Sequence, residues 1–259
     1  MERDLARLAL EGGLSPASIV LTELESGTIL GALDPERGLY PASMIKTPLV
    51  AATLAASQDG LVRLDHRVEV VAANMTFNDA PSPLHPGYRA RVDELCELAI
   101  ERSDNVATNV LFDVVGRERA TQIVRDRFGL HHTAFYRKLS GSDPLIHDPL
   151  WDGVHMNAHP ASDAAALFRL IGLDRLPHSD LFRSALARQY WNNKLNQGLR
   201  EGDVFMHKTG DTDDVTHDGG ILLTAAGRAF VIVAYTGLAS TDEHNARFGP
   251  FMERLRALL

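Results

Sequence analysis

The strand-like segments of this 259-residue chain lie at its two ends, and the stretch between them has the periodicity of helices. Strand-forming apolar residues predict a β-hairpin over residues 18–24 and 28–31, and three further strands over 204–208, 221–224 and 229–235. Because the edges of a sheet need partners, the simplest arrangement is one antiparallel five-stranded sheet built from both ends of the chain.

Helical signals account for most of the rest. A helix is expected over residues 2–11, and a closing helix begins at Thr241-Asp242-Glu243, so terminal helices should cover one face of the sheet. Helical periodicity without strands is found between them, over 47–58, 91–102, 105–114, 117–128, 161–171 and 179–190. We therefore expect an α/β protein of the α+β kind, with a sheet domain of residues 1–46 and 200–259 and an all-helical domain of residues 47–199.

Charge and hydropathy exclude several classes of function. The net charge is -8 and basic residues are scattered singly, which argues against a nucleic-acid partner. No apolar run approaches the roughly 18 residues of a membrane span, and the opening Met1-Glu2-Arg3-Asp4 does not resemble a secretory signal. As it stands, the sequence predicts a cytoplasmic monomer, or a periplasmic or secreted protein if a signal peptide has been removed.

The metal-ligating residue types show no pattern of a cofactor site. Cys96, the one cysteine, falls on the apolar side of a predicted helix and is interpreted as a buried structural residue. His155 and His159 are four residues apart but lack the Glu of a zinc-protease helix, and Pro160 follows at once. We expect neither a metal nor another cofactor.

Three short motifs occur in one order: Ser43-Met44-Ile45-Lys46, Ser103-Asp104-Asn105 and Lys208-Thr209-Gly210. Each alone has a plain structural interpretation, as a helix cap, a capping box or a strand end. At average composition all three in order are expected in on the order of one chain in a thousand or fewer. Together they supply the groups of a serine acyl-transferase without a Ser-His-Asp triad, placed at the seam between sheet and helices.

In these motifs the chain resembles class A β-lactamases and penicillin-binding proteins. The resemblance extends to residues 94–100 ahead of Ser103 and to the helix start at 160–163 after a long irregular loop. It implies that Ser43 is the acylated nucleophile and Lys46 its proton acceptor, and that Ser103 relays a proton to the leaving nitrogen.

The resemblance also implies the substrate contacts. Asn105 would bind the substrate amide, Lys208 and Thr209 would hold a substrate carboxylate, and the backbone N–H groups of Ser43 and Asp211 would form the oxyanion hole. From the residue type alone, Gly210 is expected to let a substrate pass close to the backbone. The implied partner is a small β-lactam, or a peptide, amide or ester.

One expected group is missing, because class A enzymes carry a loop Glu that activates the deacylating water. This chain has no Glu between Glu118 and Glu201, so Asp143 or Asp148 could substitute, although an Asp is one methylene shorter and Asp143 before a proline is also a common turn former. No Arg that would support a substrate carboxylate is evident around residues 218–220. Three hypotheses stay open: a β-lactamase-like hydrolase that deacylates slowly, an amidase, D-aminoacyl peptidase or esterase of the same fold, and a ligand-binding sensor without turnover.

Overall fold

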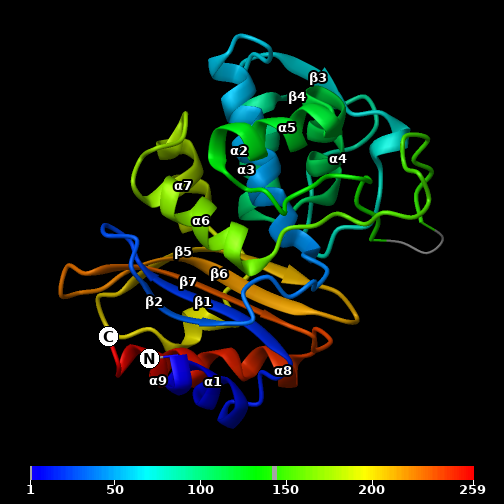
Figure 1. Cartoon of the computed structure of the whole chain (residues 1–259). Helices are drawn as coiled ribbons and strands as arrows, with labels where there is room; N and C mark the ends of the chain where they lie inside the picture. Colours follow the sequence, from blue (N-terminus) through cyan, green and yellow to red (C-terminus); the bar gives the residue numbers. More distant parts are fainter. Residues whose placement is uncertain (1, 142–144) are drawn as a thin grey trace.

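The structure is a computed structural model that describes residues 2–141 and 145–259. Its centre is a five-stranded antiparallel sheet in the order β2-β1-β7-β6-β5, shown in Figure 1. The strands are β1 (Ala17–Glu23), β2 (Ile29–Leu33), β5 (Val204–Asp211), β6 (Thr216–Leu223) and β7 (Ala229–Thr236). The two ends of the chain join where β1 pairs with β7, from Ala17 opposite Thr236 to Glu23 opposite Phe230. The predicted sheet is confirmed.

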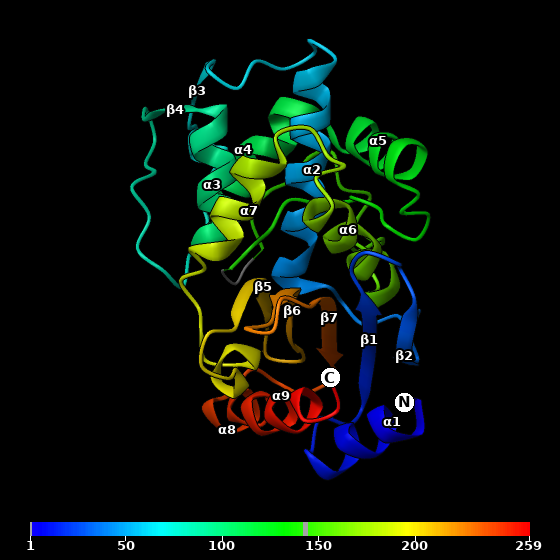
Figure 2. The same ribbon diagram turned by 90° about the vertical axis from the view of Figure 1, so that its left-hand side faces the viewer.

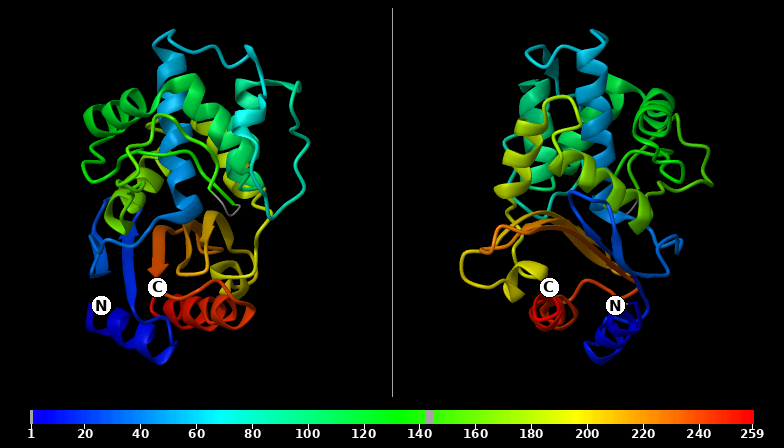
Figure 3. Two further views of the ribbon diagram at one scale, coloured as in Figure 1. Left: turned by 90° about the vertical axis from the view of Figure 1, so that its right-hand side faces the viewer. Right: turned by 60° about the vertical axis from the view of Figure 1, so that its left-hand side comes forward.

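Each face of the sheet is covered by helices, as Figures 2 and 3 show from three sides. The terminal helices α1 (Glu2–Glu11), α8 (Asp242–Ala246) and α9 (Phe248–Arg256) lie on one face, and residues of α1 and α9 share an apolar core with that face. The helical lobe lies on the other face and shares a second, larger core with it. The terminal helices and the helical lobe therefore agree with the predicted fold class, while the division into two domains stays a prediction.

The helical lobe is organised around its first helix. It contains α2 (Lys46–Gln58), α3 (Val92–Glu101), α4 (Asn105–Val115), α5 (Arg117–Phe128), α6 (Ala161–Gly172) and α7 (Ser179–Ala187). Every residue of α2 from Lys46 to Ala56 is buried, as expected for a helix that other helices surround. Cys96 on α3 is fully buried, in line with its structural interpretation, and burial raises the pKa of its thiol. No helix of the described part of the chain is both long and apolar enough to cross a membrane.

Two strand predictions were incomplete. The region 47–199 was expected to contain no strand, but β3 (Arg67–Glu69) pairs with β4 (Arg89–Arg91). Both strands have three residues and carry arginines, so no alternating apolar pattern marks them. Strand β6 begins at Thr216, five residues before the predicted 221, because polar residues and Gly219-Gly220 hide its pattern. Gly220 packs so tightly that an added Cβ would lie 2.2 Å from the Met206 carbonyl oxygen.

Candidate active site

Ser43 lies in a single 3-10 turn (Ala42–Ile45) that leads directly into α2, whose first residue is Lys46. The Ser43 side chain is half-buried, whereas Lys46 is fully buried. Ala42, the residue before Ser43, has a left-handed φ of 48°, a conformation that costs on the order of 1–3 kcal/mol for a residue other than glycine. The turn and the helix place Ser43 and Lys46 one helical turn apart, as predicted.

Gly210 has a role that differs from the expected one. A Cβ at this position would lie 3.1 Å from both the Met44 side chain and the Pro41 carbonyl oxygen. The glycine therefore makes room for the turn that carries Ser43, rather than for a substrate. Close packing of β5 on this turn brings the first and third motifs together.

Ser103 joins the two cationic residues. Its Oγ accepts hydrogen bonds from Lys46 Nζ at 3.0 Å and from Lys208 Nζ at 2.9 Å. Lys46 Nζ also donates to the Ser103 carbonyl oxygen and to Asn105 Oδ1, the latter at 2.7 Å. Residues from all three motifs therefore form one hydrogen-bonded cluster, with Lys46 and Lys208 both fully buried.

The backbone at Ser103 is held in an uncommon conformation, with a φ of 59°. Asp104, the next residue, caps α4 by accepting the Ala107 N–H at 2.8 Å. The backbone N–H of Asn105 makes a further hydrogen bond, which it donates to Asn78 Oδ1 at 2.6 Å. The helix cap therefore offsets the strain and fixes the hydroxyl between the two amines.

Burial lowers the pKa of Lys46 to about 7, although the carboxylates of Asp104 and Asp79 oppose this effect. The pKa of Lys208 is also lowered well below its ordinary value, first by burial and then by the charges of Lys46 and Lys194. Near neutral pH the two buried amines therefore carry less than two full positive charges between them. A neutral amine at Lys46 has the lone pair that a base requires.

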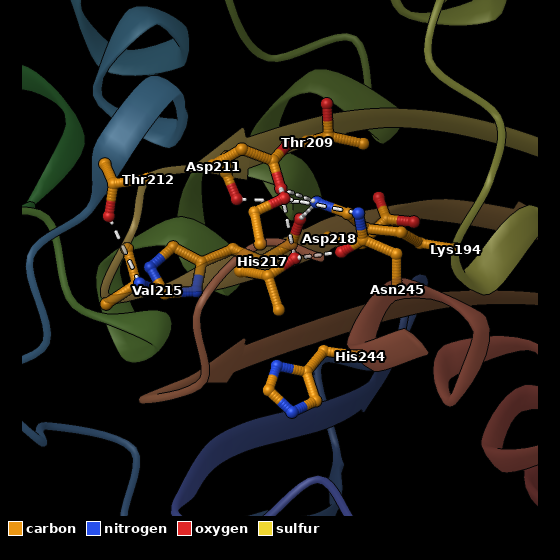
Figure 4. Close-up of polar contacts among 12 residues, drawn as sticks. Lys194, Thr209, Asp211, Thr212, Val215, His217, Asp218, His244 and Asn245 are labelled. Atoms are coloured by element: carbon orange, nitrogen blue, oxygen red, sulfur yellow. Dashed lines mark hydrogen bonds and ion pairs between the residues drawn. The ribbon is translucent and has the colours of Figure 1, made fainter. Parts of the chain in front are cut away.

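Lys194 is a third buried cation, which the sequence analysis missed. Its Nζ contacts Asp211 Oδ1 at 2.5 Å, the His217 carbonyl oxygen at 3.0 Å and the Gly210 carbonyl oxygen at 3.4 Å (Figure 4). Burial favours a raised pKa at Asp211, but the charge and hydrogen bond of Lys194, together with hydrogen bonds from Ser240 and Thr216, outweigh it and lower this pKa. Lys194 therefore places a positive charge beneath the end of β5, where no Arg was found. No sequence motif marks it.

The residues predicted to bind substrate have the following environments. Ser43, Ser103, Thr209 and Asp211 line one cavity of about 500 Å³, and Lys46 and Lys208 lie behind Ser103. Both polar atoms of the Asn105 side chain have partners within the protein. Oδ1 accepts a hydrogen bond from Lys46 Nζ at 2.7 Å, and Nδ2 donates to the Phe77 carbonyl oxygen at 2.9 Å. The roles of these residues toward a substrate stay predictions.

The loop expected to supply the deacylating carboxylate has only part of its length described. Asp143 lies outside the described residues. Asp148 is not available as a base, because it forms a buried ion pair with Arg117 and accepts the Lys138 N–H at 2.7 Å. Its carboxylate anchors the loop to α5, which argues against its use as a substitute for the missing Glu.

Leu139, a buried residue of the described part of the loop, is held against α4 by its backbone. Asn109, one helical turn after Asn105, accepts the Leu139 N–H at 2.8 Å and donates to its carbonyl oxygen at 2.9 Å. Two residues on, Gly141 lies against Asn105, whose Nδ2 would be 3.3 Å from an added Cβ. An apolar side chain therefore occupies the stretch of loop that is fixed beside the Lys46 cluster.

The two histidines considered for a metal face different surroundings. His155 is exposed and pairs with Asp152 at 2.5 Å, whereas His159 is buried and contacts Thr133 Oγ1 at 2.8 Å. Over residues 2–141 and 145–259, no group of three His, Cys, Asp or Glu side chains is arranged to hold a metal ion.

Comparison with known proteins agrees with this geometry. Similar solved structures include a Leu-to-Glu variant of PBP-A as an acyl-enzyme with penicillin G (23% identity, TM-score 0.81, 98% of this chain and 96% of that one). A β-lactamase from Sphaerobacter thermophilus has 22% identity and a TM-score of 0.81, and the match covers 98% of this chain and 96% of that one. An ancestral class A β-lactamase has 23% identity and a TM-score of 0.84, and the match covers 100% of this chain and 99% of that one. No curated protein matches. At these identities the structures show a shared fold.

The sequence itself matches the family described as "Beta-lactamase enzyme family" over residues 1–249. This match includes all three motifs and nearly the whole sheet and helical lobe. The chain therefore belongs to the β-lactamase enzyme family.

Proposed function

We propose that this protein is a serine hydrolase that forms an acyl-enzyme on Ser43 with β-lactams or related amides and esters, and that it deacylates slowly. The observation that carries the proposal is the shared hydrogen bonding of Ser103 Oγ with Lys46 and Lys208, beside a cavity lined by Ser43. The penicillin G acyl-enzyme of the similar PBP-A variant supports a β-lactam as an acylating substrate.

In the proposed acylation step, Ser43 Oγ attacks the carbonyl carbon while its proton passes to the neutral amine of Lys46. Ser103 Oγ then delivers a proton to the leaving nitrogen as the C–N bond breaks, and regains one from Lys46. The N–H groups of Ser43 and Asp211 stabilise the oxyanion, and Lys208 with Thr209 holds an anionic substrate group. The pKa of about 7 at Lys46 supports its assignment as the base.

Deacylation needs a second base, and the carboxylates in the described part of the loop are both engaged in ion pairs. Asp148 is paired with Arg117, Asp152 is paired with His155, and Leu139 is apolar. We therefore propose that water attacks the acyl-enzyme slowly, so that the first turnover is fast and later ones are slow.

Rapid mixing with a chromogenic cephalosporin tests the proposal. The expected result is a burst of about one equivalent per active site, followed by a slow phase, with the acyl adduct seen by intact-protein mass spectrometry. Ser43→Ala is the control and should give neither. Linear progress curves without an adduct at steady state would identify a competent hydrolase, and Asp143 would then be its candidate base. Absence of both turnover and adduct with cephalosporins and esters would favour the binding-module hypothesis.

An amidase, peptidase or esterase of the same fold is favoured by one observation as well. The cavity beside Ser43 is lined by four carboxylates, those of Asp79, Asp211, Asp213 and Asp242. Lys194 is paired with Asp211, but the other three carboxylates at the rim favour neutral or cationic amides and esters over a substrate whose only charge is a carboxylate.

A further inference from the structure

The cavity beside Ser43 continues into a second one. Four residues, Trp191, Asn193, Asp242 and Asn245, line both the inner cavity of about 500 Å³ and an adjoining outer cavity of about 850 Å³. Small-molecule sites typically have about 300–1,000 Å³, so the inner cavity alone accommodates a compact ligand. The two together accommodate an extended one.

The wall of the outer cavity is the segment 190–197, and hydrogen bonds fix it in place. Asn192 Nδ2 donates to the Gln189 carbonyl oxygen at 2.6 Å, and Asn192 Oδ1 accepts a hydrogen bond from His207 Nε2 at 3.1 Å. Gln197 Nε2 donates to the Asn192 carbonyl oxygen at 2.6 Å. Gly198, which follows, packs so closely on α9 that an added Cβ would lie 2.1 Å from the Gly249 carbonyl oxygen. The outer cavity is therefore preformed.

The boundary between the two cavities is also ordered. Asn245 is buried, its Oδ1 accepts the Thr216 hydroxyl at 2.7 Å, and its Nδ2 donates to Ser240 Oγ at 3.2 Å. Ser240 in turn donates to Asp211 Oδ1 at 2.6 Å. Figure 4 shows Asn245 near Asp211 and Lys194, so the boundary is tied to the end of β5 that faces Ser43.

The chemistry of the outer cavity fits a cation and amide groups. Trp191 is half-buried, and its ring lies edge-on to that of Tyr190 at 5.1 Å. Asp242 and Glu253 are exposed carboxylates without an ion pair to a described residue, and no Lys or Arg is among the described residues that line either cavity. Aromatic faces and carboxylates bind ammonium groups, and side-chain amides such as Asn193 pair with peptide groups.

We propose that the outer cavity is a substrate subsite that takes the ammonium-bearing end of an extended, peptide-like amide or ester whose reactive carbonyl lies at Ser43. This assignment rests on the proposed function for its covalent step, and it names the substrate class. Trp191 and Asp242 are its specificity-determining residues. A terminal carboxylate in place of the ammonium meets only like charges at this end of the cleft.

Binding to the Ser43→Ala variant tests the subsite apart from catalysis. Three ligands share a D-alanine amide core and carry an aminohexanoyl, hexanoyl or adipoyl chain, so that they end in ammonium, methyl or carboxylate. Calorimetry should give a dissociation constant for the ammonium ligand at least about tenfold below that of the carboxylate ligand, which corresponds to about 1.4 kcal/mol. The preference should shrink as salt is added.

In the Ser43→Ala background, Asp242→Asn and Trp191→Ala should each reduce the preference for the ammonium ligand. Asp126→Asn is the matched control, because it removes the same charge from an exposed position on α5 and should leave the preference unchanged. The inference is overturned if the carboxylate ligand binds as tightly as the ammonium ligand, or if Asp126→Asn has the effect of Asp242→Asn. A far-ultraviolet spectrum like that of the parent shows that each variant is folded.

The covalent step is tested separately with the unmodified protein and N-hexanoyl-D-alanine ethyl ester, in which an ester replaces the amide of the hexanoyl ligand. An adduct on Ser43 in mass spectrometry supports the proposed function. If no adduct forms with this ester or with the cephalosporin while the ammonium ligand still binds best, the proposed hydrolase fails and the subsite stands. If the adduct forms but binding shows no charge preference, the subsite fails and the hydrolase stands.

Discussion

The burial of Lys46 places a stability cost on the fold that can be worked out from its pKa. Its pKa falls from 10.5 to about 7, because the ammonium group is fully buried. It is also the first residue of α2, where the helix dipole disfavours a cation. At about 1.36 kcal/mol per pKa unit, the charged form costs about 5 kcal/mol of folding free energy at low pH.

The sign of the pH dependence follows from the direction of this shift. Between about pH 7 and 10.5 the unfolded chain binds the Lys46 proton and the folded chain does not. The free energy of unfolding therefore rises with pH in this window. Below this pH window Lys46 is charged in both the folded and the unfolded chain, and the full cost of burying the charge applies. Above the window Lys46 is neutral in both, and this cost is absent.

Lys46→Met removes the charge and keeps the length of the side chain. The change also removes the hydrogen bonds to Ser103 and Asn105, and leaving such buried acceptors unpaired costs about 1–3 kcal/mol. We therefore expect a net gain of about 2–4 kcal/mol in the free energy of unfolding at neutral pH, with loss of acylation.

Urea unfolding followed by tryptophan fluorescence, repeated from about pH 6 to 10, measures this difference. The advantage of Lys46→Met over the parent should be largest at the lowest pH and shrink as pH rises. Lys138→Met is the control, because it breaks the 2.7 Å ion pair with Asp113 and should lower stability. A Lys46→Met variant no more stable than the parent, or an advantage that does not change with pH, would refute the reasoning.

Three further outcomes are expected. Ser43→Ala should abolish labelling by a β-lactam or fluorophosphonate probe and leave circular dichroism unchanged, and labelling that persists would contradict its assignment as nucleophile. The acylation rate measured by stopped flow should rise about tenfold per pH unit below about 7 and then level off, whereas a flat profile would contradict Lys46 as the base. Leu139→Glu should accelerate the slow phase about a hundredfold without changing the burst amplitude, and a slow phase that does not change would show that the loop does not reach the acyl group.

Much of the fold was predictable because its strands are apolar and its motifs sit at the ends of elements. Strand β7 has buried residues from Phe230 to Thr236, and its run of β-branched and aromatic residues is typical of a central strand. The convergence of Lys46, Ser103 and Lys208 followed from placing each motif against a predicted helix or strand. Tertiary packing then brought the three together at one hydroxyl, as their chemistry requires.

What the sequence did not predict depends on contacts between distant residues. Lys194 acts through main-chain carbonyl groups of β5 and β6, which no motif encodes. The position of Leu139 is fixed by two hydrogen bonds between its backbone and Asn109, thirty residues away, and a leucine in a loop does not by itself predict such contacts. Asp148 looked like a substitute base until its buried partner Arg117 was known.

The two lysines explain how one site can take up and release a proton without a histidine. The charge of Lys46 contributes to the lowered pKa of Lys208. In the proposed mechanism, a proton that arrives at Lys46 from Ser43 raises this repulsion at once. Ser103 Oγ is hydrogen-bonded to both amines and is therefore placed to carry the proton away toward a leaving nitrogen. The burial that destabilises Lys46 therefore also makes it a reversible proton acceptor.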